Sequence, residues 1–378
     1  MIETGIQLWN EVNPWRRRLA GAAVVVMAGL PGACAPRVAA QAPQSSPPAV
    51  ELLYVAIQDE AKIAVVDMAT REVRRTIDLT ALGFSPNAKP HHIVVEPDGS
   101  AFYVSLIGDN AVVKFERDGS VLARHTTETP GMLALHPTEP LLLMSRSMSA
   151  VNPPPRIGIV SRTDLRGEEI DVFFPRPHPM VVAPGGIAYT GSLGVNQLAA
   201  VDIAAQRVEL TDIPGSPHAL VQYALSPNGQ SLVASTELSG RLLVFDLAMP
   251  MKPRLVREVA VGPMAFDPVF SPDGRQVWVP VKGANAVAVI ETTGWTVVDR
   301  IEHPALRQPH QIVFSADGST AFVSNNNKAD HMAGHEAHGG PDPAAVGSLV
   351  VIDAASRDVV RAIELGRNLT GMGARARR

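Results

Sequence analysis

Three histidines, His331, His335 and His338, lie within eight residues near the C-terminal end of this 378-residue chain. Neutral imidazole is a good ligand for Zn(II), Cu(II) or Ni(II), and three imidazoles leave a coordination position open. The spacing i, i+4 and i+7 would place all three on one face of a short helix. The surrounding segment is rich in glycine, so a flexible polar loop without metal is the alternative. We predict a segment that binds Cu or Zn, without a catalytic role of its own.

A second group of histidines recurs at one position of a repeated segment. Six segments share an apolar run that ends in a turn, as in "HHIVVEPDG", "VQYALSPNG" and "HQIVFSADG". The position six residues before the turn proline, or before its alanine equivalent, holds His91, Gly131, His178, Val221, Phe266 and His310. If the segments are equivalent strands, three imidazoles from distant parts of the chain converge.

We therefore predict a cofactor- or ligand-binding site at His91, His178 and His310, with His92 and His218 near the same rim. Convergent polar groups in a concave channel are typical of ligand sites. A purely structural alternative exists, because a proline precedes four histidines, and this step could serve only to start a strand. Arg146, which follows an apolar strand, is a candidate anion contact at the same site, with a surface ion pair as its alternative.

The elements that position these residues are short strands. The turn positions Pro97, Pro137, Pro184, Pro227, Pro272 and Ala316 are 40 to 47 residues apart. Each turn is followed by alternating Val, Ile, Phe and Tyr residues with Gly, Asn and Asp between them, which is the pattern of strands joined by hairpins. A repeat of this length with four short strands is typical of a β-propeller blade.

The two ends of the repeat array complete one another. Residues 51–79 supply three strands without the leading one, and "NLTGMGAR" near the C-terminus resembles a leading strand with nothing after it. Six complete copies and one blade shared by both ends give seven blades. The sequence thus predicts an all-β, seven-bladed propeller that is closed by pairing of its N- and C-terminal strands, which removes exposed sheet edges.

The segments "LLYVAIQDEAKIAVVDMATREVRRTIDL" and "GSLVVIDAASRDVVRAIELGRN" resemble the YVTN repeat of YncE-like seven-bladed propellers. The chain is more loosely similar to the propellers of nitrous oxide reductase and of haem d1 proteins. The first resemblance implies a periplasmic protein that binds a ligand or acts as a scaffold and is not an enzyme. The second implies, as an alternative, an oxidoreductase or cofactor-assembly protein in which the histidines ligate copper or a haem d1-type macrocycle.

The N-terminal part of the chain has the features of an export signal. Three arginines, Arg16 to Arg18, precede a short apolar segment, and small residues stand before Gln41. We predict a signal peptide over residues 1–40, a disordered tether over 41–50 and the propeller over 51–378. The segment before Cys34, the one cysteine, also resembles a lipoprotein box, so a periplasmic protein with a lipid anchor at Cys34 is an alternative to a soluble one.

Composition limits the classes of partner. The formal net charge is −4 and only 19% of residues are charged, which argues against binding to duplex nucleic acid. Aromatic residues make up 5%, which also weakens the hypothesis of a single-stranded nucleic-acid binder. The apolar segment near the N-terminus is too short to span a bilayer. We expect a monomer that binds a metal ion or a small ligand in its central channel, with a periplasmic protein as a further candidate partner.

Overall fold

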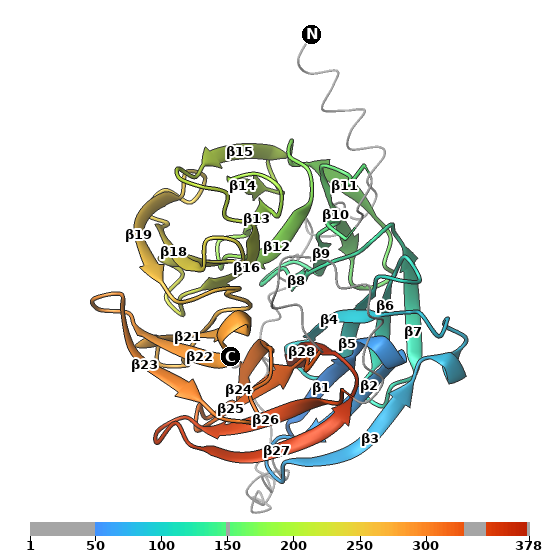
Figure 1. Cartoon of the computed structure of the whole chain (residues 1–378). Coiled ribbons are helices and arrows are strands. Elements are labelled where there is room, and N and C mark those ends of the chain that lie inside the picture. Colours follow the sequence, from blue (N-terminus) through green and yellow to red (C-terminus); the bar gives the residue numbers. More distant parts are fainter. Residues whose placement is uncertain (1–49, 149–151, 329–344, 376–378) are drawn as a thin grey trace, which may run out of the picture. The chain divides into compact units, whose positions relative to one another are not determined.

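The computed structural model describes residues 50–148, 152–328 and 345–375. In these ranges the strands form seven four-stranded antiparallel sheets, which stand as blades around a common axis (Figure 1). Apart from the strands, the described residues contain three short 3-10 helices, η2 (Gln58–Glu60), η3 (Thr80–Leu82) and η4 (Lys282–Ala284). The predicted all-β, seven-bladed propeller is confirmed.

Each blade consists of four strands that run in order from the ring axis outwards. Blade 1 contains β28 (Leu369–Ala374), β1 (Leu52–Ile57), β2 (Lys62–Asp67) and β3 (Glu72–Asp78). Blade 2 contains β4 (Pro90–Val95), β5 (Ala101–Leu106), β6 (Ala111–Glu116) and β7 (Val121–Thr126). Blade 3 contains β8 (Leu133–Leu135), β9 (Leu141–Met144), β10 (Arg156–Ser161) and β11 (Gly167–Asp171).

The remaining four blades follow the same order. Blade 4 contains β12 (Pro177–Val182), β13 (Ile187–Ser192), β14 (Gln197–Asp202) and β15 (Arg207–Asp212). Blade 5 contains β16 (Leu220–Leu225), β17 (Ser231–Thr236), β18 (Arg241–Asp246) and β19 (Arg254–Ala260). Blade 6 contains β20 (Val269–Phe270), β21 (Gln276–Val281), β22 (Ala286–Glu291) and β23 (Thr296–Glu302). Blade 7 contains β24 (Pro309–Phe314), β25 (Thr320–Asn325), β26 (Gly347–Asp353) and β27 (Val359–Gly366).

The apolar core is divided among the interfaces between neighbouring blades. The second and third strands of each blade are almost fully buried, whereas outer strands such as β3 and β7 are largely exposed. Each of the seven interfaces holds one apolar cluster. Between blades 1 and 2, the rings of Tyr54 and Phe102 stack with centroids 4.0 Å apart. Blades therefore stabilise one another face to face, as expected for sheets that are apolar on both faces.

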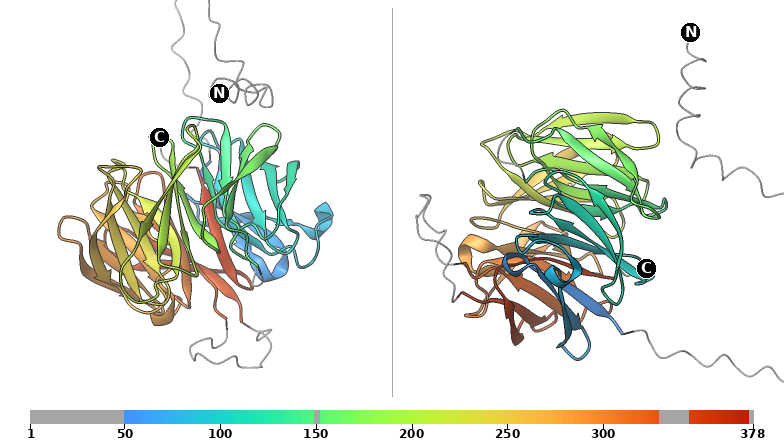
Figure 2. Two further views of the ribbon diagram at one scale, coloured as in Figure 1. Left: turned by 90° about the horizontal axis from the view of Figure 1, so that it is seen from above. Right: turned by 90° about the vertical axis from the view of Figure 1, so that its right-hand side faces the viewer.

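The C-terminal strand closes the ring. Strand β28 pairs with β1 through Leu53 and Ala374, Tyr54 and Gly373, and Val55 and Met372. Its glycines permit a close approach to β4, because a Cβ atom on Gly371 would clash with the backbone of His91. Figure 2 shows β28 in red among the inner strands. Pairing the two chain ends in this way leaves no inner edge of β1 unpaired.

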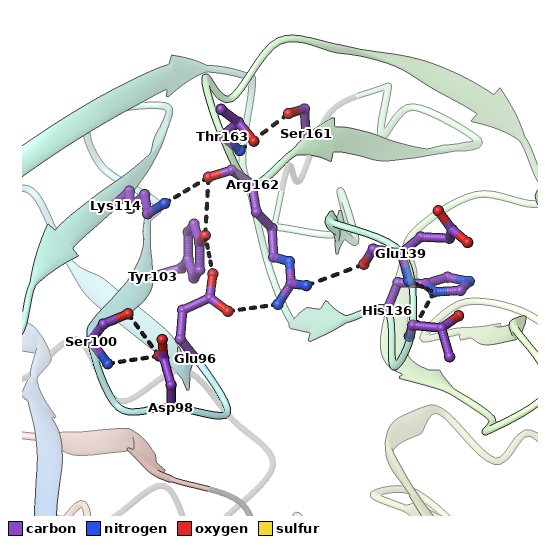
Figure 3. A network of polar contacts seen from close by, with 11 residues as sticks. Glu96, Asp98, Ser100, Tyr103, Lys114, His136, Glu139, Ser161, Arg162 and Thr163 are labelled. Atoms are coloured by element: carbon purple, nitrogen blue, oxygen red, sulfur yellow. Dashed lines mark hydrogen bonds and ion pairs between the residues drawn. The ribbon is translucent and has the colours of Figure 1, made fainter. Parts of the chain in front are cut away.

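A polar network joins blades 2 and 3 at the end of the ring where the Pro-Asp-Gly turns lie (Figure 3). Glu96, the residue after β4, accepts a hydrogen bond from the Tyr103 hydroxyl at 2.7 Å and forms an ion pair with Arg162 at 2.6 Å. Lys114 donates to the carbonyl oxygen of Arg162 at 2.7 Å. Arg162 also donates to the carbonyl oxygen of Glu139. The network thus anchors the loop after β10 to the preceding blade.

Candidate functional site

The strand pairings place the predicted channel residues at one register. Pro90 pairs with Leu106 in blade 2, Pro177 with Ser192 in blade 4 and Pro309 with Asn325 in blade 7, each at the start of an inner strand. The residue that follows this position in each blade forms what we call the first register: His91, Gly131, His178, Val221, Phe266, His310 and Thr370.

Three histidines of the first register lie close together in the structure. The ring centroid of His91 is 6.1 Å from that of His178 and 6.4 Å from that of His310. The ring of Phe266 lies 5.1 Å from that of His310. The three histidines come from blades 2, 4 and 7, which are not neighbours in the ring, so they meet because the inner strands surround the common axis. We call His91, His178 and His310 the axial histidine cluster.

Burial keeps these imidazoles neutral. His91, His178 and His310 are each 7% exposed. Burial, followed by the charge of His178, lowers the pKa of His91 well below its usual value, and burial likewise lowers the pKa of His178 to about 4. The pKa of His310 is well below its usual value, again through burial first and through Lys282 second. Burial favours the uncharged form of a base, so all three act at neutral pH as neutral donors and acceptors.

The hydrogen bonds fix which ring nitrogen carries the proton. Nδ1 of His91 lies 3.1 Å from Oε1 of Gln58, and Nδ1 of His178 lies 2.5 Å from the carbonyl oxygen of Val221. Both oxygens can only accept, so both Nδ1 atoms donate and both Nε2 atoms carry a lone pair. Nε2 of His91 and Nδ1 of His310 are buried and have no hydrogen-bond partner among the described residues.

The residues one position further along form a second register, and most of its polar members link neighbouring strands. Nδ1 of His92 accepts a hydrogen bond from the Leu133 amide at 3.1 Å. Oε1 of Gln222 accepts one from the Met180 amide at 3.1 Å, and Oε1 of Gln311 accepts one from the Met372 amide. His92, which the sequence placed near the ligand site, therefore bonds the inner strand of blade 3, and burial lowers its pKa to about 3.

Asp267 occupies the same second register in blade 6 but has no such partner. Its side chain is 3% exposed, and neither carboxylate oxygen has a hydrogen-bond partner within the described ranges. Burial raises the pKa of Asp267 to about 7, against the opposing effect of the Lys282 charge. Pro268 follows directly and lacks an amide hydrogen, and β20 begins only at Val269. The inner strand of this blade is thus interrupted where a buried acid stands.

Lys282, the first residue of η4, brings a positive charge to the same place. Its ammonium lies 4.3 Å from the ring centroid of Phe266, a favourable cation–π position. Burial lowers the pKa of Lys282 to about 8, Glu237 and Asp267 raise it, and Lys328 lowers it. The charge of Lys282 also lowers the pKa of His91 and of His310. Lys282 forms no ion pair with a carboxylate in the part of the chain that the structure describes.

Two other predicted site residues have partners elsewhere. Both ring nitrogens of His218 are engaged, Nδ1 with the Ser239 hydroxyl at 2.7 Å and Nε2 with the carbonyl oxygen of Pro214 at 3.1 Å. The Arg146 guanidinium is buried and forms ion pairs with Glu128 and Glu169. The ion pairs of Arg146 are buried on the arginine side rather than at the surface, and the roles predicted for His218 and Arg146 stay predictions.

Metal binding stays a prediction. His331, His335 and His338 lie outside the described residues. Among the residues that are described, no group of three or more His, Cys, Asp or Glu side chains is arranged to hold a metal ion. The nearby charge of Lys282 also opposes a divalent cation beside His91 and His310.

Sequence reasoning missed Asp267 and Lys282. The predicted site was centred on the repeat position of His91, His178 and His310, and Asp267 stands at the next repeat position, together with His92, Gln222 and Gln311. Polar residues that recur at a second repeat position could therefore have indicated Asp267 from the sequence. Lys282 lies in the hairpin "VKGAN" and carries no sequence signal that distinguishes it from other turn lysines.

Comparisons with known proteins support the fold and go no further. The structure of a functionally unknown protein from Desulfotomaculum acetoxidans DSM 771 matches with a TM-score of 0.68 and 14% identity, over 86% of this chain and 99% of that chain. Dihydro-heme d1 dehydrogenase NirN in complex with DHE matches with a TM-score of 0.58 and 15% identity, over 89% and 77% of the two chains. Kuenenia stuttgartiensis hydrazine synthase matches with a TM-score of 0.57 and 19% identity, over 74% and 87%.

Sequence comparison identifies no relatives. No protein-family model matches the chain, and no curated protein matches it either. The resemblance to YncE-like propellers therefore stays a prediction, whereas the seven-bladed fold is shown. Within the described ranges, no helix is long and apolar enough to cross a membrane.

Proposed function

We propose that this protein is a binding propeller that holds a small ligand at the axial histidine cluster. The observation that carries the proposal is a set of buried polar atoms without partners among the described residues: Nε2 of His91, Nδ1 of His310 and both oxygens of Asp267. Each buried group of this kind costs about 1–3 kcal/mol when it stays unpartnered. A ligand that supplies the missing partners would recover much of this energy.

The location of the site supports a binding role. The three histidines come from blades 2, 4 and 7, so their arrangement depends on closure of the whole ring rather than on one hairpin. A site built on inner strands is held more rigidly than one on a surface loop. The proposal includes the periplasmic location that residues 1–40 predict.

A binding screen tests the proposal. We would measure thermal unfolding of the purified protein with Zn(II), Cu(II), simple carboxylates, amines and amino acids, and record native mass spectra for ligands that co-purify. His91→Leu removes the unpartnered Nε2, and His125→Ala on the outer strand β7 is the matched control. We expect a probe or co-purified compound that stabilises the wild type and the control but not His91→Leu. Equal effects of every compound on all three proteins would exclude the axial histidine cluster as the binding site.

A metal-linked function is the second candidate, and one observation favours it. The Nδ1 atoms of His91 and His178 each donate to a carbonyl-type oxygen, which leaves the lone pair of each ring on Nε2. Metal-ligating imidazoles are usually held in this way. Copper, or the iron of a haem d1-type macrocycle, would give visible absorption, so the colour and the elemental content of the purified protein decide this candidate.

A further inference from the structure

The charges beside the axial histidine cluster specify the kind of ligand, provided that the proposed binding function holds. Asp267 and Lys282 belong to the same blade, and their segments lie side by side: Ala265 pairs with Val281, and the Lys282 amide donates to the carbonyl oxygen of Met264 at 2.9 Å. Each charge also affects the pKa of the other. They nevertheless form no ion pair, since no Lys282 nitrogen lies within 4.0 Å of a described carboxylate oxygen. Two opposite charges that are close but not in contact suit a ligand that carries both.

Two deeply buried residues offer hydrogen-bond acceptors: His91, and Asp267, whose amide donates to the carbonyl oxygen of His310 at 3.3 Å. The oxygens of Asp267 accept when the carboxyl group is ionised, and Nε2 of His91 accepts because Nδ1 donates to Gln58. Both residues are more than nine-tenths buried. A ligand must therefore bring donors to these atoms, and a protonated amine brings several together with a charge that matches Asp267.

Lys282, which is more accessible than Asp267 and His91, offers a cation. Lys282 retains partial solvent exposure, and its ammonium contacts only the face of Phe266 among the described charged or aromatic groups. A carboxylate would pair with it in the usual geometry of a charge-assisted hydrogen bond. A ligand with only one charge would leave the opposite protein charge unpaired, which is unfavourable where water is scarce.

We infer that the axial site takes a small zwitterion of the amino-acid class, with its ammonium group against Asp267 and His91 and its carboxylate against Lys282. Such a ligand has no net charge, so it pairs with both protein charges without adding a new one. The inference deepens the proposed function by naming a ligand class.

Calorimetric titration of the wild-type protein is the first test. Glycine, β-alanine and 4-aminobutyrate carry both charges at increasing separation. Methylamine carries only the ammonium group, and acetate carries only the carboxylate. We expect at least one zwitterion to bind at least about tenfold more tightly than either methylamine or acetate, because it makes both charge-assisted contacts. Binding of acetate or of methylamine as tight as that of every zwitterion would overturn the inference.

Two variants provide a second test that folding defects cannot imitate. Asp267→Asn should weaken methylamine and zwitterion binding at least about tenfold and should not weaken acetate binding. Lys282→Gln should weaken acetate and zwitterion binding and should not remove methylamine binding, while Lys282→Arg should keep acetate binding. Parallel loss of all three ligand types in both variants, or no loss in either, would contradict the assignment of the two charges.

The outcomes separate this inference from the proposed function. If another compound binds in a His91-dependent manner while the zwitterions do not, the ligand class is wrong and the binding function stands. If no compound shows His91-dependent binding, both fail.

Discussion

The polar side chains at the two ends of strand β4 differ in whether they have hydrogen-bond partners. Glu96, just after its last residue, accepts from Tyr103 and pairs with Arg162 (Figure 3). His91, near its first residue, keeps a buried nitrogen without a partner among the described residues, and Asp267 in blade 6 keeps two such oxygens. Burial of a polar group is common to both regions. The two regions differ in whether the buried polar groups have partners within the protein. This difference distinguishes a structural network from a candidate binding site.

The difference has an energetic reason. A partly buried carboxylate with a cation and a hydroxyl at hydrogen-bond distance contributes to stability, or at least costs little. A buried carboxylate without partners destabilises the folded chain, so its presence is best explained by a partner that comes from outside the chain. His92 differs from Asp267 in this respect, because its Nδ1 accepts a hydrogen bond from the neighbouring blade; its place near the ligand site stays a prediction.

The largest expected effect comes from opening the ring that holds both regions. Deleting residues 369–378 removes β28, the strand that pairs with β1 and packs beside β4. The backbone groups of β1 lose their partners, and the first register loses a member. We expect loss of the cooperative thermal transition, because the net stability of a domain is only about 5–15 kcal/mol. Unfolding at the wild-type temperature would show that closure does not depend on β28.

The second largest expected effect is a change with pH in the stability that Asp267 contributes. Its folded-state pKa is raised from 3.8 to about 7, so the folded chain favours the protonated acid. Stability from this group is complete below pH 3.8 and is lost as the pH rises through about 7. The free energy of unfolding of Asp267→Asn relative to wild type should therefore increase between pH 4 and pH 7, by on the order of 3 kcal/mol.

Chemical denaturation at several pH values measures this difference. Other titrating groups, including the buried histidines, are present in both proteins and largely cancel. A difference between variant and wild type that does not change with pH would mean that Asp267 has partners or solvent in solution.

Removing the charge of Glu96 should lower the unfolding free energy, whereas Asp267→Asn should raise it relative to wild type as the pH increases. Glu96→Gln leaves the Arg162 guanidinium, whose side chain is 16% exposed, without its charged partner. We expect a loss of about 2 kcal/mol in unfolding free energy at pH 7. Asp164→Asn, which removes an exposed partner of Arg166, is the control and should change stability by less than about 0.5 kcal/mol. A stabilising Glu96→Gln would remove the contrast between the two ends of β4.

Much of the fold could be predicted from local sequence. Turns such as Pro97-Asp98-Gly99 depend on a few neighbouring residues, and Gly99 adopts the left-handed φ of +74° that its turn requires. Repetition of these turns predicted the blade number and the shared blade. It also predicted the common register of His91, His178 and His310, because equivalent strands carry equivalent positions.

The partners of these side chains could not be predicted in the same way. His92 bonds an amide 41 residues away, and Gln311 bonds one 61 residues away. Whether Asp267 finds a partner depends likewise on the spacing of blades that are distant in sequence. The isolation of its carboxylate is therefore a property of the closed ring, which no local segment of the sequence encodes.

The smallest effect on stability is expected from the three histidines near the C-terminal end of the chain. Replacing His331, His335 and His338 with alanine should change the unfolding free energy by less than about 0.5 kcal/mol, because the sequence places them in a glycine-rich polar segment outside the repeated strands. Zinc binding should nevertheless be lost, since each imidazole supplies one coordinate bond that water replaces poorly. Binding to the wild type should weaken below about pH 6.5, where imidazole is protonated. Calorimetric titration with Zn(II) at pH 7.5 and pH 5.5 measures both effects, with His91→Leu as the comparison variant. Retained zinc binding in the triple variant together with its loss in His91→Leu would place the metal at the axial histidine cluster and would contradict a site at the three C-terminal histidines.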